Sequence, residues 1–276
     1  MKMSNKVPEV TLFFWIIKIL ATTVGETAAD FLSTRLHLGL GATSCVMGAV
    51  FLIALFVQMK STRYVPSIYW IVVVCISVVG TLISDNLVDN LGLSLMTTTM
   101  AFGCALAAVF ALWWISERTL SVHTIVTTKR EAFYWAAILF TFALGTSAGD
   151  LAAEASHLGY GLSALMFASA IAVIAFAYYV LKMNGILAFW IAYILTRPLG
   201  ASTGDLLSQS VPDGGLGFGT TLTSFAFLSA IVGLVVYLSR EQKRRDLSAA
   251  LEALRLGSPD ERRRAAGLRT AGNDPA

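Results

Sequence analysis

Long apolar segments recur along the chain and are separated by short polar connections. A membrane span needs about 20 apolar residues. Eight segments approach or exceed this length, at roughly residues 10–34, 42–58, 68–90, 94–115, 133–155, 161–181, 186–208 and 218–239. The first, third, fifth and seventh carry polar residues, whereas the other four are almost purely apolar. The pattern predicts an all-α membrane protein whose eight transmembrane helices occupy residues 1–239 and form four pairs.

The first span of each pair carries the same motif: an aromatic residue, then Trp, then Gly ten residues and Asp fifteen residues after that Trp. The tryptophans are Trp15, Trp70, Trp135 and Trp190, the glycines Gly25, Gly80, Gly145 and Gly200, and the aspartates Asp30, Asp85, Asp150 and Asp205. The copies are 55, 65 and 55 residues apart.

Two spans per copy give every copy the same orientation, so the sequence predicts four parallel tandem repeats around an axis near the membrane normal. The arrangement is pseudo-four-fold, or a two-fold of pairs, with repeats at about 10–60, 65–117, 130–183 and 185–239. We expect the spans that carry the motif to surround the axis and the apolar spans to face lipid.

Four tandem two-span repeats, each with a marked tryptophan, resemble a bacterial family described only as multi-pass membrane-anchored proteins built from a repeat of unknown function. The resemblance covers residues from about 10 to 240. It implies the eight-span fold and a bacterial inner membrane, and it carries no established activity.

Composition supports a membrane location, because 56% of the 276 residues are hydrophobic and only 13% are charged, against about 25% charged in soluble domains. One set of connections holds Lys2, Lys6, Lys60, Arg63, Arg118, Lys129, Arg130 and Lys182, and the other set holds only Arg35. The positive-inside rule therefore predicts that both termini are cytoplasmic. Residues 240–276 read as a basic tail, in part an amphipathic helix on anionic lipid and disordered beyond residue 257.

Polar residues in the motif spans follow one helical face, at 7, 11, 15 and 19 residues after the Trp. The acids are Glu26, Asp30, Asp85, Asp89, Asp150, Glu154 and Asp205. The supporting hydroxyls are Thr22, Ser77, Thr81 and Thr146, and the basic residues near this face are Lys18 and Arg197. A polar stripe in apolar spans faces the bundle interior or a water-filled cavity.

The energetic cost favours a functional role for these acids. At about 2.5–3.5 kcal/mol each, seven unpaired acids near mid-membrane cost roughly 20 kcal/mol, more than the about 5–15 kcal/mol by which proteins are stable. Lys18 and Arg197 neutralise two as internal counter-ions and leave a formal charge of minus five. We expect the four repeat aspartates to form a central ring that binds cations, with Glu26, Asp89 and Glu154 either carrying protons or supporting the ring from the surrounding positions. The alternative is that the carboxylates only join helices through hydrogen bonds.

Three further features each have two interpretations. The repeat glycines permit close helix packing, or they mark a kink, which Pro198 favours locally. The tryptophans anchor the membrane interface, or they form a gate. His37 and His157 lie at equivalent positions and turn the loop, or they form an external site for a transition metal.

Carboxylate and hydroxyl oxygens suit Mg, Ca or Mn, and imidazole adds Zn. The sequence thus predicts a proton-coupled transporter of divalent cations, with manganese-like ions as the first candidate cargo. Its expected partners are lipids, protons and the transported cation, with no nucleic acid and no tightly bound cofactor. The sequence is compatible with a homo-oligomer. The alternatives are an exporter of small solutes or organic cations, an intramembrane metal-dependent hydrolase, and a structural or sensor role.

Overall fold

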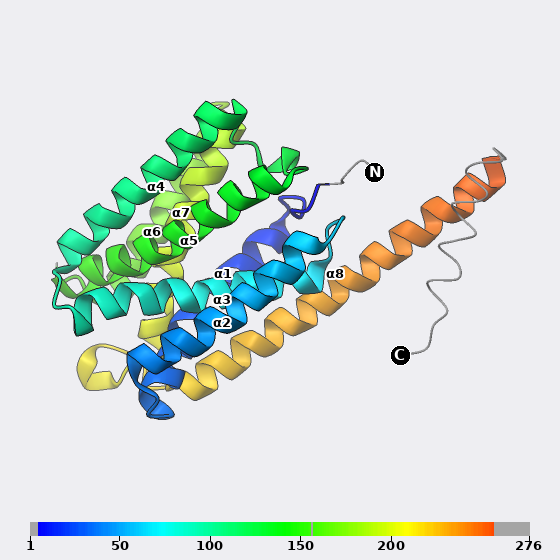
Figure 1. The fold of residues 1–276 in the computed structure, drawn as a ribbon. Helices are drawn as coiled ribbons and strands as arrows, with labels where there is room; N and C mark the ends of the chain where they lie inside the picture. The colour runs from blue at the N-terminus through cyan, green and yellow to red at the C-terminus, as the bar shows by residue number, and fades with distance from the viewer. Residues whose placement is uncertain (1–4, 156, 257–276) are drawn as a thin grey trace. The chain divides into compact units, whose positions relative to one another are not determined.

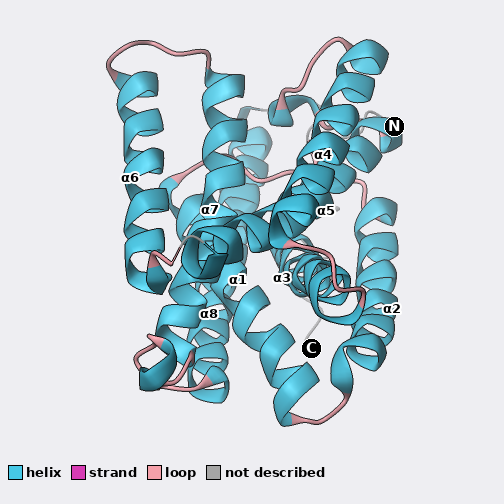
Figure 2. Cartoon of the chain, turned by 90° about the vertical axis from the view of Figure 1, so that its left-hand side faces the viewer, coloured by secondary structure: helices cyan, strands magenta, loops and turns pink. Residues whose placement is uncertain are grey.

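The computed structural model describes residues 5–155 and 157–256, and these residues are helices joined by short loops with no strand among them (Figure 2). The eight long helices are α1 Leu12–Asp30, α2 Gly39–Lys60, α3 Pro66–Asp85, α4 Leu95–Glu117, α5 Thr128–Asp150, α6 Gly159–Tyr179, α7 Gly185–Ser208 and α8 Thr220–Leu256 (Figure 1). All eight are long and apolar enough to cross a membrane. The prediction of eight spans in an all-α membrane protein is confirmed.

The chain divides into two compact units at Val232, within α8. In the first unit, the helices that carry the motif are α1, α3, α5 and α7, here called the motif helices. They form a closed ring, because α1 packs on α3 and α7, and α5 packs on α3 and α7. Each intervening helix packs on the next motif helix, α2 on α3, α4 on α5 and α6 on α7. Ser224 of α8 donates to Thr27 of α1 at 2.7 Å.

Burial separates the two kinds of helix. In the most apolar 18-residue stretch of each motif helix 56–67% of the residues are buried, against 11–17% in α2, α4 and α6. The intervening helices also expose large apolar side chains, such as Leu52, Ile53 and Phe56 of α2. Such exposed surfaces are suited to lipid. The prediction that the motif helices lie inside is confirmed.

The helix boundaries have local causes. The side chains of Thr11, Thr127 and Asn184 accept backbone N–H groups at the starts of α1, α5 and α7, as N-cap residues do. Pro66 occupies the first turn of α3, where its missing N–H is no loss.

The carboxyl ends of the first three motif helices continue into one wider, π-helical turn each. These turns are Phe31–Arg35, Asn86–Asn90 and Leu151–Ala155. In the fourth repeat α7 runs on to Ser208 without such a turn, although it contains Pro198. Short π-helical segments are frequent at functional sites. The repeat aspartate is the last α-helical residue before each of the three turns, so the turns start at the site of interest.

Helix α8 is continuous from Thr220 to Leu256 and crosses the predicted boundary between span and tail. The predicted amphipathic helix is therefore the end of α8. Leu247 and Leu251 on it are exposed. The disorder predicted beyond residue 257 lies outside the described residues.

Candidate cation site

The motif repeats as a set of contacts between neighbouring repeats, and the aromatic pair comes first. The aromatic residue before each Trp packs on the Trp of the next repeat: Phe14 on Trp70, Tyr69 on Trp135, Tyr134 on Trp190 and Phe189 on Trp15, with ring centroids 5.5–6.3 Å apart. The hydroxyls of Tyr69 and Tyr134 hydrogen-bond at 2.5 Å. These eight residues, here called the aromatic layer, fill the centre of the bundle where the motif helices begin.

The interface-anchor interpretation of the tryptophans is wrong. Trp70, Trp135 and Trp190 are buried, each less than 5% exposed, and Trp15 is half-buried. The physical reason is that the aromatic rings pack against each other around one axis, and such pairs stabilise a core beyond the area that they bury. Their position closes one end of the bundle, which agrees with the gate interpretation.

The repeat glycines are the second contact. A Cβ on Gly25 would overlap Ser77, and one on Gly80 would overlap Phe142. The same rule holds for Gly145 against Arg197 and for Gly200 against Thr22. In every case the neighbour stands seven residues after the Trp of the next repeat. Because α7 stays helical through Gly200, the close-packing interpretation is confirmed and no unwound point forms there.

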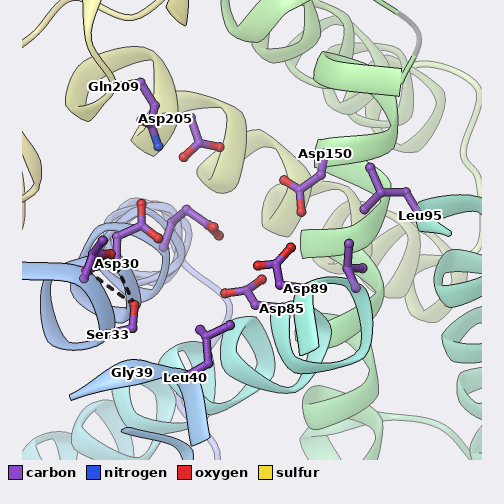
Figure 3. Close-up of a pocket in the computed structure, with 13 residues that line it drawn as sticks. Asp30, Ser33, Gly39, Leu40, Asp85, Asp89, Leu95, Asp150, Asp205 and Gln209 are labelled. Atoms are coloured by element: carbon purple, nitrogen blue, oxygen red, sulfur yellow. Dashed lines mark hydrogen bonds between the residues drawn. The ribbon is translucent and has the colours of Figure 1, made fainter. Parts of the chain in front are cut away.

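The aspartates are the third element of the motif, and they meet at one cavity. It has a volume of about 390 Å³ and lies where the motif helices end. Its charged lining consists of Glu26, Asp30, Asp85, Asp89, Asp150 and Asp205. Figure 3 shows the carboxyl groups of the labelled aspartates directed toward a common space. The quartet of equivalent aspartates, here called the aspartate ring, thus shares one hollow.

The described lining contains no basic side chain. Its uncharged members are Ser33, Thr34, Gly39, Leu40, Val88, Leu95 and Gln209. Thr34, Asp89 and Gln209 stand nineteen residues after their Trp, the outermost predicted position of the stripe. The side chain of Glu154, the corresponding residue of the third repeat, lies outside the described residues.

Exposure rises in layers along the motif helices. Three residues after the Trp, the layer of Lys18, Val73, Ile138 and Tyr193 is buried. Seven residues after it, the layer of Thr22, Ser77, Phe142 and Arg197 is also buried. At fifteen residues, Asp205 is 7% exposed and the other three aspartates are half-buried. At nineteen, Thr34 and Asp89 are exposed. The cavity is therefore open at one end only.

Arg197 is the predicted counter-ion that the structure pairs with an acid. Its Nη2 donates to Glu26 Oε2 at 2.9 Å, to Thr146 Oγ1 at 2.6 Å, and to Thr81 Oγ1. Its Nη1 donates to the carbonyl of Thr22 at 3.5 Å. Arg197 belongs to the fourth repeat and its partners to the other three, so one guanidinium joins all four repeats on the axis.

Lys18 differs from the prediction. Its ammonium donates to the carbonyl of Tyr193 at 2.9 Å and to Thr196 Oγ1, and it lies 3.8 Å from the centre of the Tyr193 ring. Among the described side chains, no carboxylate lies within 4.0 Å of it. It does not neutralise an acid there, because the layers between it and the cavity are filled by Thr22, Phe142 and Arg197. Its partners gave no sequence signal, since neither Tyr193 nor Thr196 belongs to the motif.

The predicted histidine pair lies outside the cavity lining. Both His37 and His157 are exposed and have a backbone φ of 53°. The equivalent residue of the second repeat is Gly92, with φ of 68°. Left-handed backbone favours Gly and tolerates His better than most residues. The loop-turning interpretation therefore explains both histidines.

A second buried ion pair was not predicted. Lys6 donates to Glu131 at 2.7 Å and to the carbonyl of Met59 at 2.9 Å, and Gln58 donates to the other Glu131 oxygen at 3.2 Å. It fastens the segment before α1 to the start of α5 and the end of α2. The sequence offers no signal for it, because a lysine close to a predicted cytoplasmic terminus is already explained by topology.

The geometry of the lining bears on metal binding. Among the side chains that the structure describes, no group of three or more His, Cys, Asp or Glu is placed to hold a metal ion directly. The carboxyl groups instead surround a volume many times the about 30 Å³ of one water in the liquid. The cavity therefore has room for a cation together with its coordinated water.

Fold and cavity together define the class: a multi-pass helical membrane protein of four tandem two-helix repeats around a carboxylate-lined hollow. The model of the family described as Repeat of Unknown Function (DUF347) matches residues 13–64, 68–119, 133–184 and 188–244. The chain belongs to this family. No curated protein and no solved structure matches the chain.

Proposed function

We propose that the protein is a membrane transporter for divalent metal cations, manganese-like ions first, and that it couples their movement to protons. The observation that carries the proposal is the cavity: six carboxyl groups line it and no basic residue appears among its described lining. Acids in a membrane-spanning bundle are costly unless water, protons, partners or cations satisfy them. Of the six, Glu26 pairs with Arg197, and the aspartate ring together with Asp89 makes up the rest of the charged lining.

The helix ends add to the attraction for cations. All four motif helices point their carboxyl ends at the cavity, and a helix carries about half a negative charge there. Asp30, Asp85 and Asp150 are the last α-helical residues of α1, α3 and α5. An acid at this end is unfavourable for the helix itself, so its presence in each of these repeats supports a site that binds positive charge.

The ligand chemistry favours hard divalent ions. Carboxylate, hydroxyl and amide oxygens line the cavity, and such oxygens with water suit Mg, Ca and Mn. The described lining of the cavity holds no imidazole, since His37 and His157 lie outside it, so the cavity itself favours these ions over zinc. The surplus of acids over cargo charge supplies groups for proton exchange, with Asp89 at the mouth and Glu26 at the base.

Topology sets the direction of the opening. With the termini placed in the cytoplasm of a bacterial cell by the positive-inside rule, the aromatic layer lies on the cytoplasmic side of the inner membrane. The cavity then opens outward, and the described conformation is an outward-open state.

The two other candidate activities lack a supporting observation. An exporter of organic cations needs aromatic walls, yet Phe142 and Tyr193 are buried in layers beneath the cavity and do not belong to its lining. A metal-dependent hydrolase needs a preformed set of three ligands, and the described side chains do not group in this way.

Flux into vesicles tests the proposal. The purified protein in proteoliposomes should take up Mn²⁺ under a proton gradient, and Asp30→Asn and Asp150→Asn should abolish uptake while the variants remain folded by gel filtration. Thr203→Ala is the control, because that hydroxyl bonds to its own helix at Leu199. Vesicles that stay inert to every divalent cation tested, or aspartate variants with normal flux, would contradict the proposal.

A further inference from the structure

A second ring of oxygens lies one helical turn below the aspartate ring. It stands eleven residues after each Trp, where Glu26, Thr81 and Thr146 carry the oxygens and the fourth position, Ala201, carries none. We call it the inner ring. The Thr146 hydroxyl donates to the carbonyl of Phe142 at 3.3 Å, and the Thr81 hydroxyl lies within donor distance of the Ser77 carbonyl at 3.2 Å and of Glu26 Oε2 at 3.5 Å. Their lone pairs therefore stay available to accept. With the Glu26 carboxylate, the inner ring is an acceptor site on the axis of the bundle.

A positive charge already occupies this ring. One nitrogen of the Arg197 guanidinium contacts the side-chain oxygens of Glu26, Thr81 and Thr146. The three acceptors come from three different helices. Arg197 itself is fully buried. The arrangement is that of a cation held by oxygens of several helices, except that this cation is tethered to the fourth helix.

Glu26 connects the inner ring to the cavity. It is 6% exposed and lines the cavity, while its Oε2 atom accepts from Arg197 at 2.9 Å. Below Arg197 the axis continues into the buried layer that holds Lys18 and into the aromatic layer, so a cation passes only when these layers also open. A cation that leaves the cavity along the axis must therefore take the place of the guanidinium at Glu26.

We infer that the inner ring is a cation-binding site of the transport path and that Arg197 is its built-in plug. A cation from the aspartate ring advances only when the guanidinium leaves Glu26. The inference rests on the proposed function for the identity of the cargo, but the plug itself can be tested with other cations. It assigns Arg197 a role beyond charge balance: it keeps small cations out of the inner ring, so that they do not cross when the layers below open.

The decisive experiment removes the Arg197 side chain by mutation and then adds free guanidinium to the solution in its place. In proteoliposomes, Arg197→Ala should pass Na⁺ or K⁺ down a gradient at least about tenfold faster than wild type, since one hydrogen bond to a charged group is worth about that factor or more. Free guanidinium should block the leak by occupying the ring. Urea has the same planar shape without the charge, so it should not block.

Three further variants make the result specific. Arg197→Lys keeps a tethered cation, so it should leak Na⁺ or K⁺ no faster than wild type. Ser147→Ala is the matched control, because Ser147 neighbours Thr146 and bonds only to carbonyls of its own helix in the described hydrogen bonds. If Arg197→Ala fails to fold, Arg197→Gln decides the question, since it keeps a hydrogen-bonding side chain at the inner ring and removes the positive charge of the plug; a leak above wild type is expected.

The outcomes separate the plug from the proposed function. A leak blocked by guanidinium supports the plug even if wild type carries no divalent cation. A folded Arg197→Ala that stays tight, or a leak that urea and guanidinium affect equally, overturns the plug while leaving Mn²⁺ transport by wild type intact. An Arg197→Gln variant that leaks no faster than wild type overturns it in the case where Arg197→Ala does not fold.

Discussion

The two halves of the same four motif helices are built on opposite principles. The half near the helix starts is packed solid, with the aromatic layer and two further buried layers closing the axis. The half near the helix ends surrounds a cavity of about 390 Å³ with six carboxyl groups. Each repeat contributes to both halves through one motif. The difference shows that this motif encodes a barrier and a site together.

Symmetry is kept where residues lie off the axis and lost where they approach it. The aromatic contacts and the glycine contacts occur four times, because each joins two neighbouring repeats. On the axis each buried layer holds only two large side chains, Lys18 with Tyr193 in one layer and Phe142 with Arg197 in the next. Lys18 comes only from the first repeat, Phe142 only from the third and Arg197 only from the fourth. Equivalent positions in other repeats are smaller, such as Val73 and Ser77.

The largest effect is expected in the aromatic layer. Phe14→Ala should lower the free energy of unfolding by about 3–5 kcal/mol, as expected for a buried aromatic, because Phe14 contacts both Trp70 and Phe189. Thermal unfolding in detergent measures it. Phe13→Ala is the control, since Phe13 is 39% exposed, and equal losses for the two would contradict the packed barrier.

A second test concerns two acids at the border between the packed half and the cavity, and it predicts stability changes of opposite sign for their variants. Glu26→Gln removes the charge that Arg197 contacts and should destabilise by about 1.5–3 kcal/mol. Asp85→Asn removes one acid from the crowded cavity at a helix carboxyl end and should stabilise by about 0.3–1 kcal/mol. Unfolding temperatures of the two variants measured side by side decide it. Shifts of the same sign would mean that Glu26 belongs to the cavity alone.

A third test concerns the close approach of the helices. Gly200→Ala places a methyl group against Thr22, and overpacking of this kind costs about 1–3 kcal/mol. Gly48→Ala in α2 has open space around it and should stabilise by about 0.5–1 kcal/mol, the helix-propensity difference between the two residues. A neutral Gly200→Ala would show that the repeat glycine is dispensable for packing.

The smallest effect is expected at the histidines. His37→Gly and His157→Gly keep a residue that tolerates the left-handed backbone, so unfolding should shift by less than about 1 kcal/mol and Mn²⁺ flux should not change. Flux lost in these variants with stability retained would restore the external metal site and extend the functional region beyond the cavity.

The sequence alone accounted for much of the architecture. The spacing of Trp, Gly and Asp predicted the repeats, the alternation of polar and apolar spans predicted which helices lie inside, and the cost of seven acids predicted a shared hydrophilic space. These inferences succeed because periodicity and solvation act residue by residue, so they leave a trace in the order of side chains.

Tertiary structure decided what depends on contacts between repeats. It turned the tryptophans inward, assigned His37 and His157 to turns, and separated the two basic residues, pairing Arg197 with Glu26 and giving Lys18 neutral partners. The physical reason is that a side chain on the axis is defined by neighbours 50 to 175 residues away, and no local pattern records which of them fills the centre. The sequence by itself determined a ring of acids in the membrane, and only the packing of four helices determined where that ring is open and what closes it.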